Sequence, residues 1–193
     1  MFDTAEMLKV FAKYRGDAIV VSGRGGKHWI KISDTALDMP LGDPAMGGHC
    51  GFAFGLALAL PHRKVVLFDS EGDLQMSMGV LLSVAEQKPA NFYHFMLDNE
   101  CYATTGGQPV PNAKNVKYDQ IALGCGYPRA FAFDDLGAFS RALPDILEQK
   151  GPVFAAMKVK PEIENEAIGN RPKWRTRTQP KVVQDLKKVL QIA

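Results

Sequence analysis

Cysteine is scarce in this chain of 193 residues, and the three that occur, Cys50, Cys101 and Cys125, lie far apart. No two of them form a CxxC pair, which is the usual start of a zinc or iron–sulfur site. Three is also an odd number, so a framework of disulfides is not indicated. This cysteine usage fits a reducing compartment, and we expect the protein in the cytoplasm.

Long apolar runs and an excess of either charge are also missing. The longest apolar stretch, CGFAFGLALAL, has about half the ~20 residues that a membrane-spanning helix needs. The N-terminal stretch lacks the apolar core of a signal peptide. The formal net charge is only +2, which indicates neither a nucleic-acid-binding surface nor an acidic tail. We therefore expect no nucleic-acid partner and no membrane contact.

Apolar strands alternate with helical patterns along most of the chain. Short apolar runs predict buried strands at 17–22, 64–70, 91–98 and 151–160, with an extended segment at 128–135. Helical spacing predicts helices at 3–14, 74–87, 119–127, 136–149 and near the C-terminus, whereas 30–44 is expected to be irregular. The stretch 44–61 predicts a further helix, which starts near Gly47 or Gly48 and is closed by Pro61. This order predicts an α/β fold: a parallel sheet with helices on both faces, in three layers. The length predicts a single domain, with 161–193 as a C-terminal arm and helix.

Polar and glycine-rich stretches follow three of the predicted strands, at 22–26, 70–73 and 98–107. In parallel sheets ligands bind beyond the carboxyl ends of the strands, so these stretches should meet at one edge. A glycine-rich turn entering a helix offers N–H groups to a phosphate, yet Glu71 in the turn SEGD would repel it. A divalent cation removes this conflict, and Asn99 can add an amide oxygen. The pattern predicts a clamp for Mg²⁺ and a diphosphate. No GxGxxG follows the first strand, which disfavours a dinucleotide.

These stretches resemble the motifs of the thiamine diphosphate enzymes, specifically their diphosphate-binding domain. KVVLFDSEGDLQM aligns without a gap on that family's GDG segment, and LDNECY aligns on its NN segment. AMGGHCGFAFGLALALPHRKVV is similar to the family's GSMG-type turn and the alanine-rich helix after it. PANFYHFMLDNECYATTGGQP is most similar to the sulfopyruvate and phosphonopyruvate decarboxylases. The resemblance covers residues 17–160.

The resemblance implies three metal ligands. Glu71 takes the place of the family's metal-binding Asp, Asn99 supplies an amide oxygen, and Cys101 supplies its backbone carbonyl. Glu is one methylene longer than Asp, so the metal must shift or the turn must open. A rival alignment would make Asp73 the ligand instead. Asp73 otherwise caps the helix expected at 74, contacts the diphosphate, or does both.

The resemblance also implies contacts from the same turns to the cofactor, thiamine diphosphate. The candidates are Ser22, Gly23, Met46, Gly47, Gly48, Gly72, Asp73, Leu74, Thr104, Thr105 and Gly106. His49 is either an active-site side chain or a structural one, and His94 is expected in the core. The run RPKWRTRTQP is either a solvated arm or a contact to an anionic substrate or a partner.

The function implied by the resemblance is that of the thiamine diphosphate- and Mg²⁺-binding subunit of a decarboxylase acting on a small anionic 2-oxoacid. In this family the cofactor carries the chemistry, and the glutamate that activates it belongs to a separate pyrimidine-binding domain. The chain has no room for that domain, so we expect a heteromer with a pyrimidine-binding α subunit, α2β2 or larger. The activating glutamate is then on the partner, and no catalytic residue is assigned here. The alternatives are a subunit of a 2-oxoacid:acceptor oxidoreductase, a carboligase, and a non-catalytic assembly module.

Overall fold

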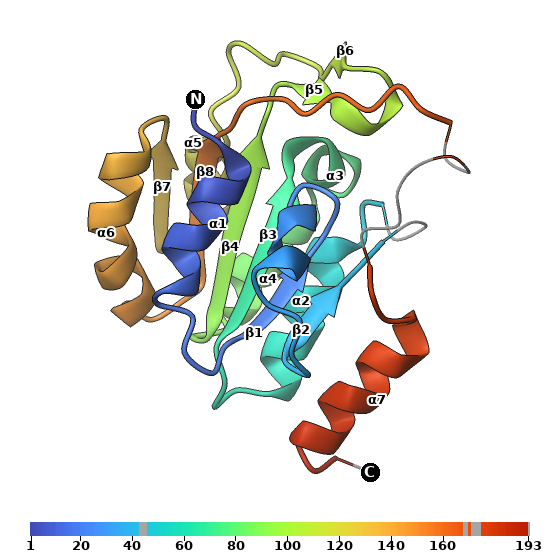
Figure 1. Ribbon diagram of the computed structural model, residues 1–193. Coiled ribbons are helices and arrows are strands. Elements are labelled where there is room, and N and C mark those ends of the chain that lie inside the picture. The colour runs from blue at the N-terminus through green and yellow to red at the C-terminus, as the bar shows by residue number, and fades with distance from the viewer. Residues whose placement is uncertain (43–45, 168–169, 171–174, 193) are drawn as a thin grey trace.

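A six-stranded parallel sheet runs through the centre of the computed structural model, which describes residues 1–42, 46–167, 170 and 175–192 (Figure 1). The strands lie in the order β2-β1-β3-β4-β8-β7, and all neighbours in this sheet are parallel. Their bounds are β1 Ile19–Ser22, β2 Asp38–Pro40, β3 Val65–Ser70, β4 Phe92–Asp98, β7 Arg129–Phe133 and β8 Val153–Lys158. A short antiparallel pair, β5 Cys101–Tyr102 and β6 Gln108–Pro109, lies above the carboxyl end of β4.

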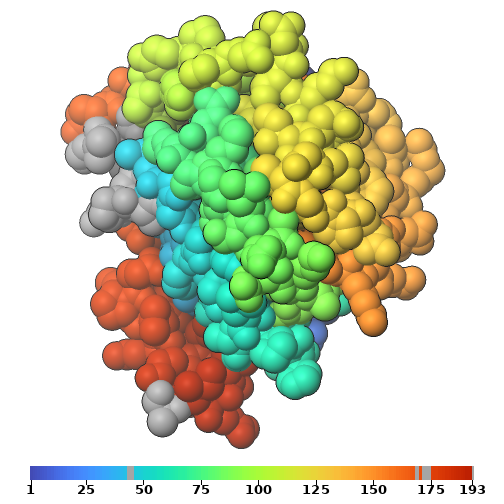
Figure 2. Space-filling model, turned by 180° about the vertical axis from the view of Figure 1, so that it is seen from behind, coloured from blue at the N-terminus to red at the C-terminus, as the bar shows by residue number. Residues whose placement is uncertain are grey.

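Helices cover both faces of the sheet. The α-helices are α1 Thr4–Ala12, α2 His49–Ala59, α3 Glu71–Met76, α4 Val80–Gln87, α5 Tyr118–Cys125, α6 Leu136–Glu148 and α7 Gln179–Val189, and the 3-10 helices are η1 Lys27–Lys31 and η2 Ala103–Thr105. Figure 1 shows α1 and α6 in front of the sheet, and Figure 2 shows α2, α4 and α5 side by side on the far face. The predicted three-layer α/β fold is therefore confirmed.

Two apolar cores lie on the two faces of the sheet because successive side chains of a strand point to opposite sides. Val21, Leu67 and Met96 pack on the side of α2, α4 and α5. Their sequence neighbours Val20 and Phe68 pack on the side of α1 and α6. Burial on both faces explains why these strands are continuous apolar runs rather than alternating ones.

The segment 30–44 was expected to be irregular, and this expectation is wrong in part. It holds the end of η1 and the three-residue edge strand β2. Asp38 begins β2 and Pro40 ends it, so the sequence has no apolar run here from which a strand could be predicted. Proline is tolerated there because an edge strand needs fewer backbone donors.

The single helix expected at 74–87 is two helices. α3 already begins at Glu71, because the Ser70 hydroxyl caps it by accepting a hydrogen bond from the Asp73 N–H at 3.4 Å. Ser77 leaves the helical conformation, and α4 restarts at Val80 after Gly79. The prediction that Asp73 caps a helix at 74 is therefore wrong, since Ser70 is the cap and Asp73 lies in the first turn.

The C-terminal helix α7 packs beside the edge strand β2. Arg177, just before α7, donates hydrogen bonds to the Asp34 carboxylate at 2.9 Å and to the Thr35 and Asp38 carbonyls at 2.8 and 3.1 Å. Part of the arginine-rich run therefore has a structural role, because Arg177 holds α7 against the segment before β2. Residues 171–174 of this run lie outside the described part of the chain. No helix among the described residues is long and apolar enough to cross a membrane.

Candidate functional site

A pocket opens where β1, β3 and β4 end, at the edge where the three polar stretches were expected to meet. β2 and β3 pair with β1 on opposite sides, so the chain changes winding direction at β1, which is where parallel α/β folds bind ligands. Its polar and charged lining includes Arg24, Lys27, His49, Ser70, Asp73, Asn99, Thr104, Lys160 and Glu162. The convergence of 22–26, 70–73 and 98–107 follows from the parallel order of the strands.

Glu71 and Asn99 converge on one donor in this region. The Cys101 N–H donates to Glu71 Oε1 at 3.1 Å and to Asn99 Oδ1 at 3.0 Å. The second oxygen of Glu71, Oε2, is buried and has no hydrogen-bond partner among the described residues. Burial raises the pKa of Glu71 to about 8. A buried carboxyl oxygen without a donor is the kind of atom that a cation would satisfy.

The turn between β4 and β5 is held in place by ion pairs. Lys158 Nζ, at the end of β8, lies 2.7 Å from the Asp98 carboxylate and 3.0 Å from Glu100 Oε1. Lys114 pairs with the other oxygen of Glu100. Glu100 itself adopts a left-handed φ of 67°, which closes the turn that presents Asn99 and Cys101.

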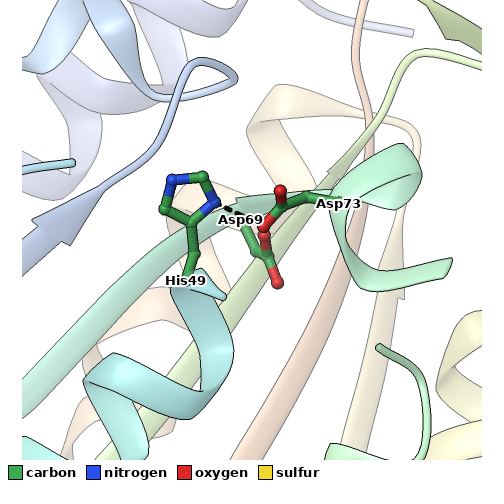
Figure 3. Close-up of side chains that lie close together, drawn as sticks. All are labelled: His49, Asp69 and Asp73. Carbon is green, nitrogen blue, oxygen red and sulfur yellow. Dashed lines mark hydrogen bonds and ion pairs between the residues drawn. The ribbon is translucent and has the colours of Figure 1, made fainter. Parts of the chain in front are cut away.

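Asp73 lies close to His49 and to the turn before α2 (Figure 3). Its Oδ2 contacts His49 Nδ1, and its Oδ1 accepts a hydrogen bond of 2.6 Å from the Gly47 N–H. Burial pushes the pKa of Asp73 upward, but the hydrogen bond and charge of His49 outweigh burial and lower it. Asp73 is therefore an ionised carboxylate facing the pocket beside a histidine.

A buried polar chain continues from this pair into the core. Asp69, the last residue but one of β3, lies beside Asp73, and its pKa is raised well above the ordinary value by burial and then by Asp73. His94 Nε2 lies 3.0 Å from Asp69 Oδ2, and its Nδ1 lies 3.8 Å from Cys50 Sγ. Burial lowers the pKa of His94 to about 3, so this imidazole is neutral. The expectation of a core histidine at 94 is confirmed.

The glycine-rich turn after β1 carries two cations at the pocket. Lys27 Nζ lies 2.7 Å from Glu164 Oε1 and 3.3 Å from Glu162 Oε2, and Arg24 lies 3.4 Å from Glu164. Both glutamates belong to the arm after β8, which runs along the top of the molecule beside β5 and β6 (Figure 1). The Glu164 N–H fixes the arm there by donating to the Ala103 carbonyl at 2.8 Å. The arm therefore supplies the counter-charges of this turn.

The structure brings most of the predicted site residues together. Met46, Gly72, Asp73, Asn99, Cys101 and Thr104 line the pocket. Ser22 ends β1, Gly23 adjoins the His49 ring, and Gly47 and Gly48 form the turn before α2. Leu74 differs, because its side chain packs in the core. Thr105 and Gly106 lie in the outer loop and do not line the pocket.

Several residues at the site were not foreseen as site residues, among them Asp69, Lys27, Glu162 and Glu164. Asp69 is adjacent to the recognised SEGD stretch and could have been suspected as a further carboxylate at a strand end. Lys27 follows the glycine-rich turn but carries no motif. Glu162 and Glu164 reach the site from an arm more than 130 residues away in sequence, and no local pattern indicates such a contact.

The donor set fits a magnesium ion bound beside a diphosphate. Glu71 Oε2 is unsatisfied and Asn99 Oδ1 is a neutral oxygen, and Mg²⁺ prefers such oxygen ligands from one or two side chains together with phosphates. The Cys101 backbone carbonyl, the third ligand that the resemblance implies, is also a neutral oxygen donor. The residues present can therefore hold the ion.

Comparison with known proteins identifies a family for this chain. The family model described as thiamine pyrophosphate enzyme, C-terminal TPP binding domain, matches residues 25–157. A phosphonopyruvate decarboxylase of Streptomyces viridochromogenes is 31% identical over 159 residues, which cover 81% of this chain and 39% of that protein. The sulfopyruvate decarboxylase subunit beta of Methanothermobacter thermautotrophicus is 38% identical over 117 residues, covering 61% of this chain and 60% of that one. The chain thus spans less than two thirds of either relative.

Two further comparisons concern chain length and fold. The sulfopyruvate decarboxylase subunit beta of Methanococcus maripaludis is 30% identical over 168 residues, and the match covers 83% of this chain and 85% of that subunit. The crystal structure of benzoylformate decarboxylase from Polynucleobacter necessarius superposes with a TM-score of 0.69 at 17% identity, over 83% of this chain and 33% of that one. The second comparison supports the fold alone.

Proposed function

Because this chain belongs to the thiamine pyrophosphate enzyme family, as a C-terminal TPP-binding domain, we propose that it is the thiamine diphosphate- and Mg²⁺-binding subunit of a 2-oxoacid decarboxylase. The relatives reported above are named decarboxylases. The observation that carries the proposal is the convergence of Glu71 Oε1 and Asn99 Oδ1 on the Cys101 N–H, with Glu71 Oε2 left for a cation.

The proposed clamp assigns the metal to Glu71, Asn99 and the Cys101 carbonyl. When bound, the cofactor would supply a nucleophilic carbon for the 2-oxo group and an electron sink for the pair left behind when CO₂ departs. The residues of this chain bind and orient it. Gly72 lies against the Tyr102 ring, where a Cβ would stand 3.0 Å from two ring carbons, so a larger residue at 72 would displace Tyr102, which lines the pocket.

The diphosphate is proposed to lie between the turns that follow β1 and precede α2. Ser22 Oγ is buried at the end of β1 with no hydrogen-bond partner among the described residues. The Gly23 N–H donates to the Phe68 carbonyl at 3.2 Å and the Gly47 N–H donates to Asp73 at 2.6 Å, so Gly48 is the proposed N–H donor of this set, and Gly23 and Gly47 are proposed to contact the diphosphate by close approach of their backbone. Met46, Gly72, Asp73, Leu74, Thr104, Thr105 and Gly106 remain proposed contacts.

The positive charges of Arg24 and Lys27 at the pocket support the proposal that the substrate is an anion. Both are balanced by Glu162 and Glu164 of the arm, so an incoming anion would exchange with a carboxylate that already lies there. A basic residue that binds a sulfonate also binds a phosphonate or a carboxylate, and the proposal is therefore limited to a small acidic 2-oxoacid.

The proposed partner is a pyrimidine-binding α subunit that contributes the activating glutamate. Two relatives are named as a subunit beta, and the chain covers 85% of the length of one of them. An active site shared with a second subunit, in a cytoplasmic heteromer of α2β2 or larger, is consistent with this.

Native mass spectrometry of the protein isolated gently from its own cells, with thiamine diphosphate and Mg²⁺ in the buffer, tests the proposal. We expect a heteromer carrying the masses of the cofactor and one divalent ion, and release of CO₂ from a small anionic 2-oxoacid. A homo-oligomer that binds no cofactor would overturn it and favour the assembly module. Iron in the complex would favour the oxidoreductase.

A further inference from the structure

Three buried donors outside the proposed magnesium clamp lie together at the pocket wall. His49 begins α2, Asp69 lies near the end of β3, and Asp73 lies in the first turn of α3. One imidazole nitrogen and one oxygen from each carboxylate lie within 4.8 Å of one another, and all three residues are buried (Figure 3). Three packed elements thus direct mixed nitrogen and oxygen donors at one point.

The cluster holds two carboxylates beside one imidazole, away from solvent. Asp69 and Asp73 each bring a carboxylate oxygen into the buried cluster, and two neighbouring carboxylates repel each other unless a proton or a metal ion lies between them. His94 is neutral and lies on the far side of Asp69, so it supplies no positive charge. His49 supplies the nitrogen donor of the cluster, and a divalent cation among the three donors would offset both carboxylates.

Asp69 and Asp73 also form hydrogen bonds with groups outside the cluster, as carboxylates that bind a metal usually do. Asp69 Oδ1 accepts a hydrogen bond from the Ser70 N–H at 2.9 Å, and Asp69 Oδ2 lies 3.0 Å from His94 Nε2. Asp73 Oδ1 accepts from the Gly47 N–H at 2.6 Å. Such outer contacts fix the orientation of ligating side chains and keep carboxylates ready to bind.

We propose that His49, Asp69 and Asp73 form a binding site for a divalent transition-metal ion of the zinc class, separate from the magnesium clamp of Glu71 and Asn99. An imidazole ligand favours such an ion over Mg²⁺, which prefers oxygen donors. Ligands that bind a tetrahedral ion at about 2.0–2.2 Å lie roughly 3.4 Å from one another, so the contacting atoms His49 Nδ1 and Asp73 Oδ2 must separate to admit the ion.

Three protein ligands leave a fourth position open. His49 and Asp73 line the pocket whereas Asp69 lies behind them, so the open position faces the pocket and would take a water or an oxyanion. The site uses none of the proposed magnesium ligands, and it can be tested without thiamine diphosphate. Its failure would therefore leave the proposed function intact.

Cobalt(II) provides the test because it reports its ligands by visible absorption. Protein freed of metal is titrated with Co²⁺ in a large excess of Mg²⁺, which fills the oxygen clamp. We expect one Co²⁺ per chain, a visible band of four-coordinate cobalt without a thiolate charge-transfer band, and displacement by Zn²⁺. No Co²⁺ binding under these conditions, or a thiolate band that reports Cys50, would overturn the proposal.

Matched variants locate the ion. H49Q and D69N should each weaken Co²⁺ binding at least tenfold, whereas E71Q and the exposed H62Q should leave it unchanged. Equal binding by H49Q and the parent, or loss of binding in E71Q alone, would overturn the assignment. Far-UV circular dichroism of the metal-free variants verifies folding, and D73N replaces D69N if the latter does not fold.

Discussion

Glu71 and Asn99 share a single hydrogen-bond donor, the backbone N–H of Cys101, at 3.1 and 3.0 Å. Glu71 follows β3 and Asn99 follows β4, so this N–H ties the ends of two neighbouring strands together. The geometry brings two potential metal ligands onto the same side of the turn before any ion is bound. Without the ion, burial of the Glu71 carboxylate should therefore lower the free energy of unfolding.

The first prediction concerns pH and the metal-free protein. Glu71 has a pKa of about 8 in the fold against an ordinary value of 4.5, so between these values the folded state holds a proton that the unfolded state has lost. The free energy of unfolding should fall as pH rises through this window, by up to about 1.4 kcal/mol per pH unit from this group. Urea unfolding in EDTA at pH 5, 6.5 and 8 measures the slope.

Glu71→Gln should flatten this dependence, and Glu6→Gln, at an exposed helical ion pair, should not. Mg²⁺ together with thiamine diphosphate should restore stability at pH 8 in the parent and not in E71Q. An identical pH slope for the parent and E71Q in EDTA would contradict the assignment of the buried proton.

The second prediction concerns the buried carboxylate of Asp38. It accepts hydrogen bonds from Arg15 at 2.9 Å, the Trp29 indole at 2.7 Å, the Ser33 hydroxyl at 2.7 Å and the Thr35 N–H at 2.6 Å. Asp38→Ala leaves these donors and the Arg15 charge unpaired, so we expect a loss of about 3–5 kcal/mol in unfolding free energy. Thermal melts should show a large fall in Tm for this variant.

Asp17→Ala is the matched control, because Asp17 pairs with Arg63 while its side chain is 79% exposed. Its melt should differ little from that of the parent. A fall in Tm of similar size in both variants would contradict the prediction that the buried hydrogen bonds of Asp38 contribute more to stability than an exposed ion pair.

The third prediction concerns the arm. Glu162→Gln with Glu164→Gln removes the carboxylates that balance Arg24 and Lys27, so small anions should bind several-fold more tightly. Titration calorimetry with methylphosphonate, at low and high salt, measures the gain, which should shrink with salt because the charges are partly exposed. Glu148→Gln, at an exposed position near the end of α6, should change nothing. Weaker binding by the double variant would mean that the arm helps to hold the anion.

The fourth prediction concerns the space beside His49. A Cβ on Gly23 would stand 3.1–3.2 Å from three atoms of the His49 ring, so Gly23→Ala must displace that ring. We expect thiamine diphosphate to bind roughly tenfold more weakly, equivalent to about 1.4 kcal/mol, with little change in Tm. Equilibrium binding in Mg²⁺ measures the loss.

Gly51→Ala in α2 is the control, since a Cβ there meets no atom within 4 Å and alanine favours a helix. It should bind the cofactor as the parent does and melt slightly higher. Normal cofactor affinity in Gly23→Ala would argue that the His49 ring can move at no cost to the cofactor site.

The main sheet could be predicted because its strands are buried on both faces and read as apolar runs. β2 could not, since Asp38 is stabilised by side chains distant in sequence rather than by an apolar pattern. The start of α3 does have a local signal. Ser70 and Asp73 have the spacing of a capping box, S-x-x-D, which predicts a helix that begins directly after Ser70.

The site was predictable where its residues lie in one turn and unpredictable where they meet across the fold. Glu71 and Asn99 each follow a strand, and parallel neighbours bring such ends together. The pairing of His49 with Asp73, and of Lys27 with Glu164, depends on how helix α2 and the arm pack, which no spacing along the chain specifies.

The Lys27–Glu164 ion pair has a consequence for biosynthesis. It joins residues 137 positions apart, so it forms only after β8 and the arm have left the ribosome. Chain closure over such a distance is slow compared with local helix formation, and a site completed this way is assembled late in folding. The nascent chain can thus build β1, β3 and β4 while the Lys27 side chain still lacks Glu164, and these counter-charges at the cofactor pocket are completed only near the end of synthesis.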